Sequence, residues 1–301
     1  MTPKPYVGTI GVSSQAPPYC RLLNTPPPPL MELTPIFVET EYVLARLHQK
    51  NSLVVDLSNQ DHFNRAHIPG AIHIDYALLI DGRKPAPGQV PDRTQLERLA
   101  NALGVRPNLH IISCDDEGGG RAARLLWTLH LIGHRHASVI DGGMTAWHGL
   151  GLPTTADPTT LSIAATTSTP GYDPDVLADR TYVLTHLHDG DVVLLDARSP
   201  AEFAGDDVRA ERGGHIPGAI NINWLDTIDT TNHRRLQCVN RLRALLEKTG
   251  ISPAKEIIVY CQTHHRSAHT YAMLKHLGYQ RVRGYAGSWA EWGNDPTTPV
   301  G

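Results

Sequence analysis

The sequence contains few cysteines and no long hydrophobic run. Only four cysteines occur among 301 residues, and none has the spacing of a CxxC pair or a zinc site. A disulfide-stapled secreted scaffold would contain more, so we expect a reducing, cytoplasmic location. No stretch of about 18 apolar residues is present, and a membrane span is therefore not predicted.

A strong excess of charge is also absent. The formal net charge is −3, which gives no reason to expect a nucleic acid or an anionic membrane as a partner. The chain is 41% apolar and 19% charged, as in ordinary globular proteins. Its length allows two domains of ordinary size.

The N-terminal segment, residues 1–30, is rich in Pro, Ser and Thr and lacks periodic apolar positions. We interpret it as a disordered extension with local polyproline character. It has no continuous apolar stretch between a basic start and a cleavage site, so a secretory signal is not predicted. Met31 directly precedes the first periodic segment, and we expect the natural start there.

One series of strand and helix patterns occurs twice, about 145 residues apart. Short β-branched runs alternate with helical patterns in each half, which predicts a mostly parallel sheet with helices on both faces. Residues 151–172, dense in Thr, Pro and Ala, are interpreted as a linker. The expected fold class is α/β, with tandem domains at residues 31–150 and 173–301. Expected helices include 94–103, 122–132 and 241–248, and expected strands include 53–57, 109–113, 138–141, 192–196, 257–260 and 281–283.

Cys261 lies at a predicted strand-to-helix turn. The run Ile257–Tyr260 predicts a buried strand and residues 268–275 predict a helix. Backbone amides at such a turn have no intrahelical acceptor and can bind an anion, and the helix dipole adds to this effect. A thiolate is thereby favoured over a thiol. Free cysteines are often only buried, but this loop has no apolar residue to pack against one, which favours a nucleophile.

The loop supplies polar side chains that suit a charged sulfur and the anion delivering it. The predicted substrate-binding loop comprises Gln262, Thr263, His264, His265, Arg266 and Ser267. Cysteine and histidine are also zinc ligands. Adjacent histidines in a tight turn diverge, however, and ligation would occupy the nucleophile, so neither a metal nor another cofactor is predicted.

Two further residues are candidates for the pocket. Arg198 is expected to pair with Asp196 after a strand, and a structural role and a pocket role are both open. Trp224 is the second candidate, with a core position as the alternative. Cys20 and Cys238 have no functional context in the sequence.

Three signatures recur in the same order in both halves. They are a strand ending in Asp followed by H-I-P-G-A-I, a cysteine loop between strand and helix, and the segments G-G-M-T-A-W and G-S-W-A-E-W. Together they resemble the tandem-domain rhodaneses, a family of sulfurtransferases, over residues 33–293. The loop C-Q-T-H-H-R-S resembles that of bacterial thiosulfate:cyanide sulfurtransferases. This resemblance implies a catalytic second domain, a degenerate, non-catalytic first domain, and structural roles for His67 and His215.

The first half contains a related but acidic loop. Aligning the two helices by their final Ile-Gly and Leu-Gly pairs places Cys114 opposite Cys261 and Arg121 opposite Arg266, with two extra residues in the first loop. The three carboxylates that follow Cys114 would raise the pKa of its thiol and repel the thiosulfate dianion. We therefore expect Cys114 to be inactive.

The resemblance also implies a substrate class. Phosphatase-like relatives have a loop one residue longer than Cys261-x4-Arg266, so sulfur transfer is favoured, and basic loop residues favour thiosulfate. The implied reaction passes the sulfane sulfur of thiosulfate through a Cys261 persulfide to cyanide or a thiol acceptor. Arg266 would bind thiosulfate or support the loop. Alternatives are a 3-mercaptopyruvate sulfurtransferase, a persulfide carrier for sulfur-acceptor proteins and a phosphatase-like relative.

Overall fold

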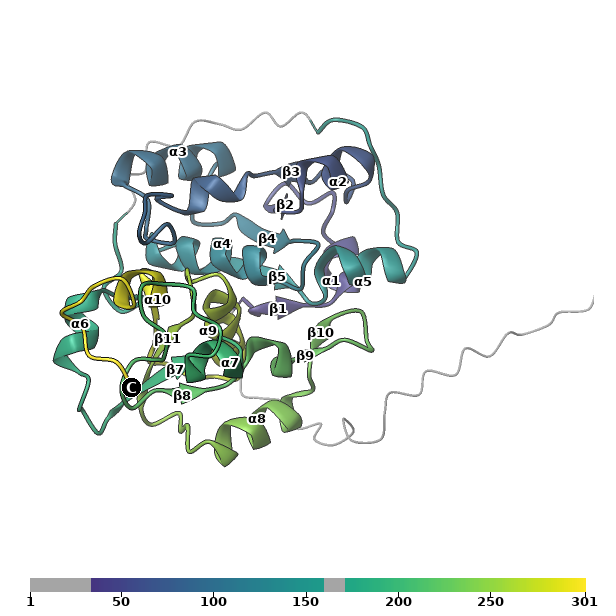
Figure 1. Cartoon of the computed structure of the whole chain (residues 1–301). Helices are drawn as coiled ribbons and strands as arrows, with labels where there is room; N and C mark the ends of the chain where they lie inside the picture. Colours follow the sequence, from purple (N-terminus) through teal and green to yellow (C-terminus); the bar gives the residue numbers. More distant parts are fainter. Residues whose placement is uncertain (1–33, 160–170) are drawn as a thin grey trace, which may run out of the picture.

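The computed structural model describes residues 34–159 and 171–301 (Figure 1). The predictions for residues 1–30 and Met31 lie outside these described residues, as does part of the proposed linker. The first domain comprises β1 (Phe37–Val38), α1 (Thr40–Leu44), β2 (Ser52–Asp56), α2 (Gln60–Arg65), β3 (Ile72–His73), η2 (Tyr76–Leu79), α3 (Arg93–Leu103), β4 (His110–Cys114), α4 (Gly120–Leu131), β5 (Ala137–Ile140) and α5 (Gly143–Gly149).

The second domain repeats this order and adds a hairpin. It comprises β6 (Leu177–Ala178), α6 (Arg180–Thr185), β7 (Val192–Asp196), α7 (Pro200–Ala204), β8 (Ile220–Asn221), η3 (Trp224–Thr227), β9 (Ile228–Asp229), β10 (Arg235–Leu236), α8 (Val239–Lys248), β11 (Glu256–Tyr260), α9 (Arg266–His276), β12 (Val282–Tyr285) and α10 (Ser288–Trp292).

Each domain is built on a five-stranded sheet. The strand orders are β1-β5-β4-β2-β3 and β6-β12-β11-β7-β8, and all neighbouring strands in both sheets are parallel. The two orders are identical when elements are matched in chain order. The predicted α/β class and the internal duplication are therefore confirmed.

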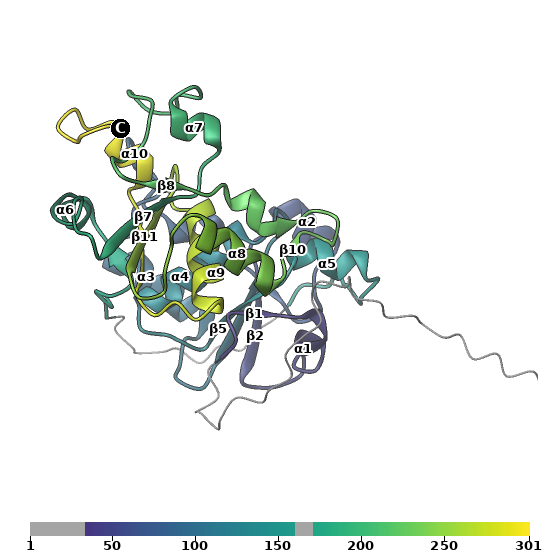
Figure 2. The ribbon, with the colours of Figure 1, turned by 90° about the horizontal axis from the view of Figure 1, so that it is seen from below.

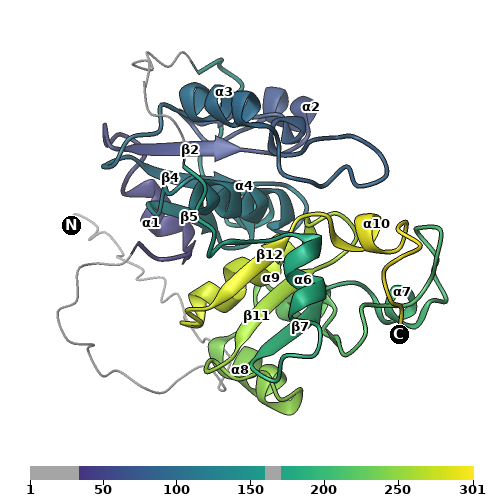
Figure 3. The same cartoon turned by 90° about the vertical axis from the view of Figure 1, so that its left-hand side faces the viewer.

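Helices cover both faces of each sheet because alternate strand residues are buried on opposite sides. In β2, Val55 belongs to a core shared with α3 and α4, while Val54 packs in a separate cluster with Val43 of α1 and Trp147 of α5. The first of these cores continues into the second domain through α4 and α9, which lie side by side where the domains meet (Figure 3). One hydrophobic core thus joins the two domains.

The β9–β10 hairpin of the second domain lies against the first domain (Figure 2). The amide of Leu236 donates to Asp141 Oδ1 at 2.7 Å, and Arg235 pairs with Glu39 at 2.7 Å. Among the described residues, no helix is long and apolar enough to cross a membrane.

Candidate active site

Cys261 directly follows β11 and precedes α9, and its side chain is fully buried. Its sulfur accepts hydrogen bonds from the amides of Thr263 and Ser267 and from the Ser267 hydroxyl. Burial raises the pKa of Cys261, but the positive charge of Arg266 and these hydrogen bonds outweigh burial and hold the pKa below its ordinary value. The loop therefore favours the thiolate.

Arg266 is fixed by a carboxylate behind the loop. Its two terminal nitrogens donate to the two oxygens of Glu202 at 2.6 and 2.8 Å. Glu202 also closes a capping box with Ser199 at the start of α7. Burial raises the pKa of Glu202, but the bonds from Arg266 and Ser199 lower it to about 2, so both partners are charged at neutral pH.

The two loop histidines face the first domain. His264 is fully buried, with its ring edge-on to Trp127 at a centroid distance of 4.4 Å. Its Nδ1 lies 2.7 Å from the Ser267 hydroxyl oxygen. His265 Nε2 lies 2.6 Å from Glu117 Oε1. The side chains of His264 and His265 therefore point away from the Cys261 sulfur and toward the first domain.

The loop predicted from sequence is thus present, but its basic side chains already have protein partners. Gln262 Nε2 donates to the Arg209 carbonyl at 2.9 Å. The Thr263 carbonyl abuts Gly88 of the first domain so closely that a Cβ there would lie 2.1 Å from its oxygen. Selection of thiosulfate by His264, His265 and Arg266 side chains does not follow from their positions in the structure.

The two residues considered as pocket candidates, Arg198 and Trp224, lie in different surroundings. Arg198 is 1% exposed, and it donates to both oxygens of Asp196 and to the Gly214 carbonyl. These bonds favour the structural role for Arg198, because its guanidinium is occupied inside the fold, and the pocket role stays a prediction. Trp224 belongs with Cys261 and Ile228 to one small buried cluster, which is compatible with both the core position and the pocket position expected for it.

The first-domain loop requires a correction. Asp56 pairs with Cys114 across the first sheet, as Asp196 pairs with Tyr260 across the second. Cys114 is therefore the counterpart of Tyr260, and Asp115 is the counterpart of Cys261. The alignment from the helix ends was wrong at this point because α4 has 12 residues and α9 has 11.

The two loops consequently have the same length. The counterpart of Arg266 is Gly120, since each is the first residue of its helix. Arg121 is therefore not opposite Arg266, and the two extra residues inferred for the first loop are not in the loop.

A carboxylate occupies the amide cradle of the first domain. Asp115 Oδ1 accepts from the amides of Glu117, Gly118 and Gly119 at 3.0, 3.1 and 2.8 Å. Its Oδ2 accepts from the Ala122 amide at 2.9 Å. The Asp115 side chain thus shows how this backbone arrangement binds two oxygens of an anion.

Cys114 lies outside that cradle, at the end of β4, and is fully buried. Burial and then the carboxylates of Asp56, Asp115 and Asp116 raise the pKa of Cys114 well above its ordinary value. The expected direction of this shift is correct, although burial is its largest cause.

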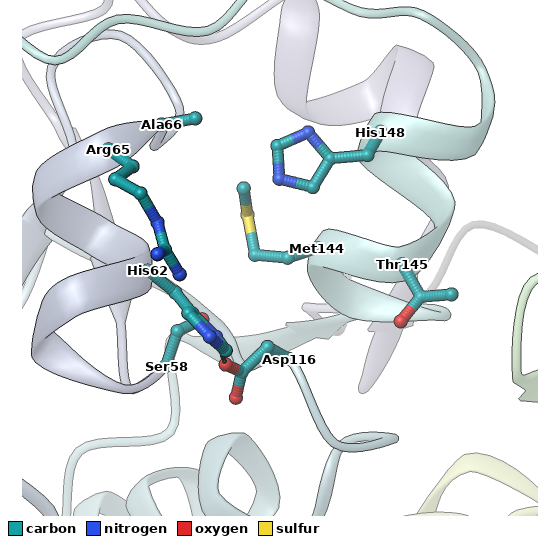
Figure 4. Close-up of a pocket in the computed structure, with 8 residues that line it drawn as sticks. All are labelled: Ser58, His62, Arg65, Ala66, Asp116, Met144, Thr145 and His148. Carbon is teal, nitrogen blue, oxygen red and sulfur yellow. Dashed lines mark hydrogen bonds and ion pairs between the residues drawn. The ribbon is translucent and has the colours of Figure 1, made fainter.

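A hollow of about 240 Å³ lies between α2, α5 and the first-domain loop (Figure 4). It is lined by Ser58, His62, Arg65, Ala66, Asp116, Met144, Thr145 and His148. In the second domain, a longer segment after α7 covers the equivalent place, where Trp289 Nε1 donates to the Arg212 carbonyl at 3.2 Å. The hollow is therefore a space that only the second domain fills.

Sequence reasoning missed several residues around Cys261. Glu202 was detectable, because S-P-A-E is a capping-box pattern at a helix start. Glu117 and Arg124, which contact the Cys261 loop from the first domain, have no local signal in the sequence. No group of three or more His, Cys, Asp or Glu residues suited to a metal ion occurs within residues 34–159 and 171–301.

The fold and the site define a duplicated α/β protein with a buried cysteine in a cradle of backbone amides. The chain belongs to the rhodanese family, since residues 39–150 and 179–295 match the family described as Rhodanese-like domain. The family resemblance seen in the sequence is thereby confirmed.

Named relatives cover most of the chain. It is 42% identical to a thiosulfate sulfurtransferase of Azotobacter vinelandii and 41% identical to one of Pseudomonas aeruginosa, each over 88% of this chain and 97% of the relative. It is 31% identical to the sulfur carrier protein TtuD of Thermus thermophilus, over 88% of this chain and 96% of that one. The anaerobic ergothioneine biosynthesis enzyme of Chlorobium limicola has the same fold, with a TM-score of 0.78 at 22% identity over 90% of this chain and 72% of that one.

Proposed function

We propose that the protein is a thiosulfate sulfurtransferase whose nucleophile is Cys261 in the second domain. The observation that carries this proposal is the position of Cys261, a fully buried cysteine in the turn between β11 and α9, whose sulfur accepts amide and hydroxyl hydrogen bonds. The similarity to thiosulfate sulfurtransferases over 88% of the chain supports thiosulfate as the donor. A cytoplasmic location remains a prediction.

The first step is attack of the Cys261 thiolate on the outer sulfur of thiosulfate. A new sulfur–sulfur bond forms at Cys261, the sulfur–sulfur bond of thiosulfate breaks, and sulfite leaves with the electron pair. The product is a persulfide anion, and no proton has to move. The amides of Thr263 and Ser267, which bind the Cys261 sulfur, would stabilise this anion with little reorganisation during the reaction.

The second step returns the enzyme to its starting state. The carbon of cyanide, or a thiolate acceptor, attacks the outer sulfur of the persulfide, and the Cys261 thiolate is the leaving group. Sulfur-acceptor proteins are also proposed as partners, because a relative at 31% identity is a sulfur carrier protein. Arg266 acts as a loop support in this proposal, because Glu202 occupies both of its terminal nitrogens.

Intact mass after incubation with thiosulfate tests the proposal. The wild type and Cys114→Ser should each gain the mass of one sulfur atom, which cyanide removes, while Cys261→Ser should gain none. An unmodified wild type, or the same gain in Cys261→Ser, would refute the assignment. A persulfide that reacts slowly with cyanide and rapidly with a protein thiol would favour the carrier alternative.

A further inference from the structure

Arg124, in α4 of the first domain, is fully buried at the boundary with the catalytic loop. Its Nη2 donates to the carbonyls of Leu79 and Gly88 at 2.8 and 2.9 Å. Its Nη1 donates to the His264 carbonyl in the catalytic loop at 3.3 Å. The guanidinium therefore links two first-domain segments to the loop that carries Cys261.

No carboxylate compensates this charge within residues 34–159 and 171–301, since all ion pairs found there involve other residues. Removing a guanidinium from water is costly unless it is paired. The negative groups that act on Arg124 are the Tyr76 phenolate and the Cys261 thiolate. Tyr76 is neutral at ordinary pH, because burial raises its pKa to about 12. The Cys261 thiolate is then the anion that benefits from this cation.

The contact with His264 also bears on the direction of the loop amides. The C=O and N–H of one trans peptide point in opposite directions, so holding the His264 carbonyl toward α4 turns the His265 N–H away from it. In the first domain Gly119, the counterpart of His265, donates its amide to the Asp115 carboxylate at 2.8 Å, but φ is +92° at Gly119 and −95° at His265, so this peptide is oriented differently in the two loops. The amides that bind the Cys261 sulfur are those of Thr263 and Ser267, on either side of His264 and His265.

His264 adopts a backbone conformation that needs support. Its φ is +54°, and its first-domain counterpart Gly118 has φ +108°. A left-handed conformation is ordinary for glycine but costs about 1 kcal/mol or more for other residues. Arg124 and the ring of Trp127 contact His264 at this position.

We propose that Arg124 is a positioning residue for Cys261: it holds the His264 carbonyl outward and thereby fixes the conformation of the loop that surrounds the sulfur, and it places an unpaired positive charge behind that loop. The effect of Arg124 on persulfide formation rests on the proposed function, whereas its effect on the pKa of Cys261 does not. The first domain is then part of the catalytic apparatus, although its own loop holds a carboxylate.

The test compares Arg124→Met, which removes the charge and the donors, with Arg124→Lys, which keeps the charge but replaces the planar guanidinium by a single ammonium nitrogen. The matched control is Arg234→Met, because Arg234 makes the reciprocal contact, donating across the interface to the Glu117 carbonyl at 2.9 Å. The first readout is the pH dependence of Cys261 alkylation by a small haloacetamide, followed by intact mass with Cys261→Ser as the blank. The second is the single-turnover rate of persulfide formation.

Arg124→Met should raise the apparent pKa of Cys261 by about one unit and slow persulfide formation about tenfold at neutral pH. Arg124→Lys should restore most of the pKa but only part of the rate. Arg234→Met should keep the wild-type pH profile. The proposal would be overturned if a folded Arg124→Met variant kept the wild-type pH profile of alkylation. It would also be overturned if Arg234→Met shifted the pKa of Cys261 as much as Arg124→Met does.

If Arg124→Met fails to fold, Arg124→Lys decides, because a wild-type persulfide rate in that variant would overturn the positioning role. Alkylation requires no thiosulfate. A wild type that forms no persulfide would therefore remove the proposed function and still leave the role of Arg124 open to measurement.

Discussion

The loop after β4 and the loop after β11 run from a central strand to a helix with the same number of residues, but they hold different anions. In the first domain the amides bind the side-chain carboxyl group of Asp115, which has no sulfur to form a persulfide. In the second they surround Cys261, whose charge depends on its surroundings. The comparison teaches that the same backbone arrangement can hold a carboxyl group or a cysteine sulfur, and in the proposed function only the cysteine can form a persulfide.

The supports of the two loops also differ. The catalytic loop is held by the Arg266–Glu202 pair, whereas the first loop has Gly120 in place of Arg266. His62, the counterpart of Glu202 in α2, pairs instead with Asp116 of its own loop. A permanent carboxylate needs no nearby cation to stay charged, but a cysteine thiolate does.

The largest effect is expected from emptying the first cradle. In Asp115→Ala, three buried amides and one partly buried amide lose their acceptor, so the free energy of unfolding should fall by about 3 kcal/mol. Urea denaturation measures this loss. Asp115→Asn keeps one oxygen acceptor and should have an intermediate stability.

Asp116→Ala is the matched control, because Asp116 is adjacent and its side chain is 21% exposed. It should cost less than about 1 kcal/mol. Equal losses in the Asp115→Ala and Asp116→Ala variants would contradict the idea that the Asp115 carboxylate fills the cradle.

The next effect concerns the support of the catalytic loop. Glu202→Gln leaves Arg266 without its carboxylate, so the loop should lose alignment and persulfide formation should slow about 10–100-fold. Asp207→Asn is the control, since Asp207 pairs with Arg209 at an exposed position nearby. A wild-type rate in Glu202→Gln would show that the pair has no role in positioning.

The same variant gives a pH test. The pKa of Glu202 is lowered from its ordinary 4.5 to about 2 in the folded protein, so its stabilising contribution is present above pH 4.5 and is lost as the pH falls toward 2. The difference in melting temperature between wild type and Glu202→Gln should therefore shrink over this interval. A constant difference would show that the charge of Glu202 contributes nothing to stability.

The sequence alone predicted much of this fold. The central strands matched well: the strand predicted at residues 192–196 is β7, and the duplication placed the two sheets correctly. Short elements such as α2 and α7 were missed, because five or six residues give no recognisable helical period. The shift by one residue at Cys114 arose because helix length differs between the domains, which only the sheet register reveals.

The candidate site was predictable in its local part. Cys261 and the loop up to Ser267 are contiguous, so a strand-loop-helix pattern identifies them. The partners of the loop come from the other domain or from distant elements, as the 140 residues between Arg124 and His264 illustrate. Contacts of that kind depend on domain packing, which has no signature in a single sequence.

The smallest effect is expected at the ion pair that joins the two loops. Glu117 Oε1 and His265 Nε2 are 2.6 Å apart, but their side chains are 34% and 25% exposed, so water and salt screen the pair. Glu117→Gln should lower stability by less than about 1 kcal/mol, and the loss should diminish at high salt. Melting temperatures at two ionic strengths measure this loss of stability. The control is Glu97→Gln, which removes the carboxylate of the exposed Arg93–Glu97 pair. A loss well above that of the control and unchanged by salt would contradict this expectation, because it would mean that the pair couples the two loops more strongly than an exposed pair does.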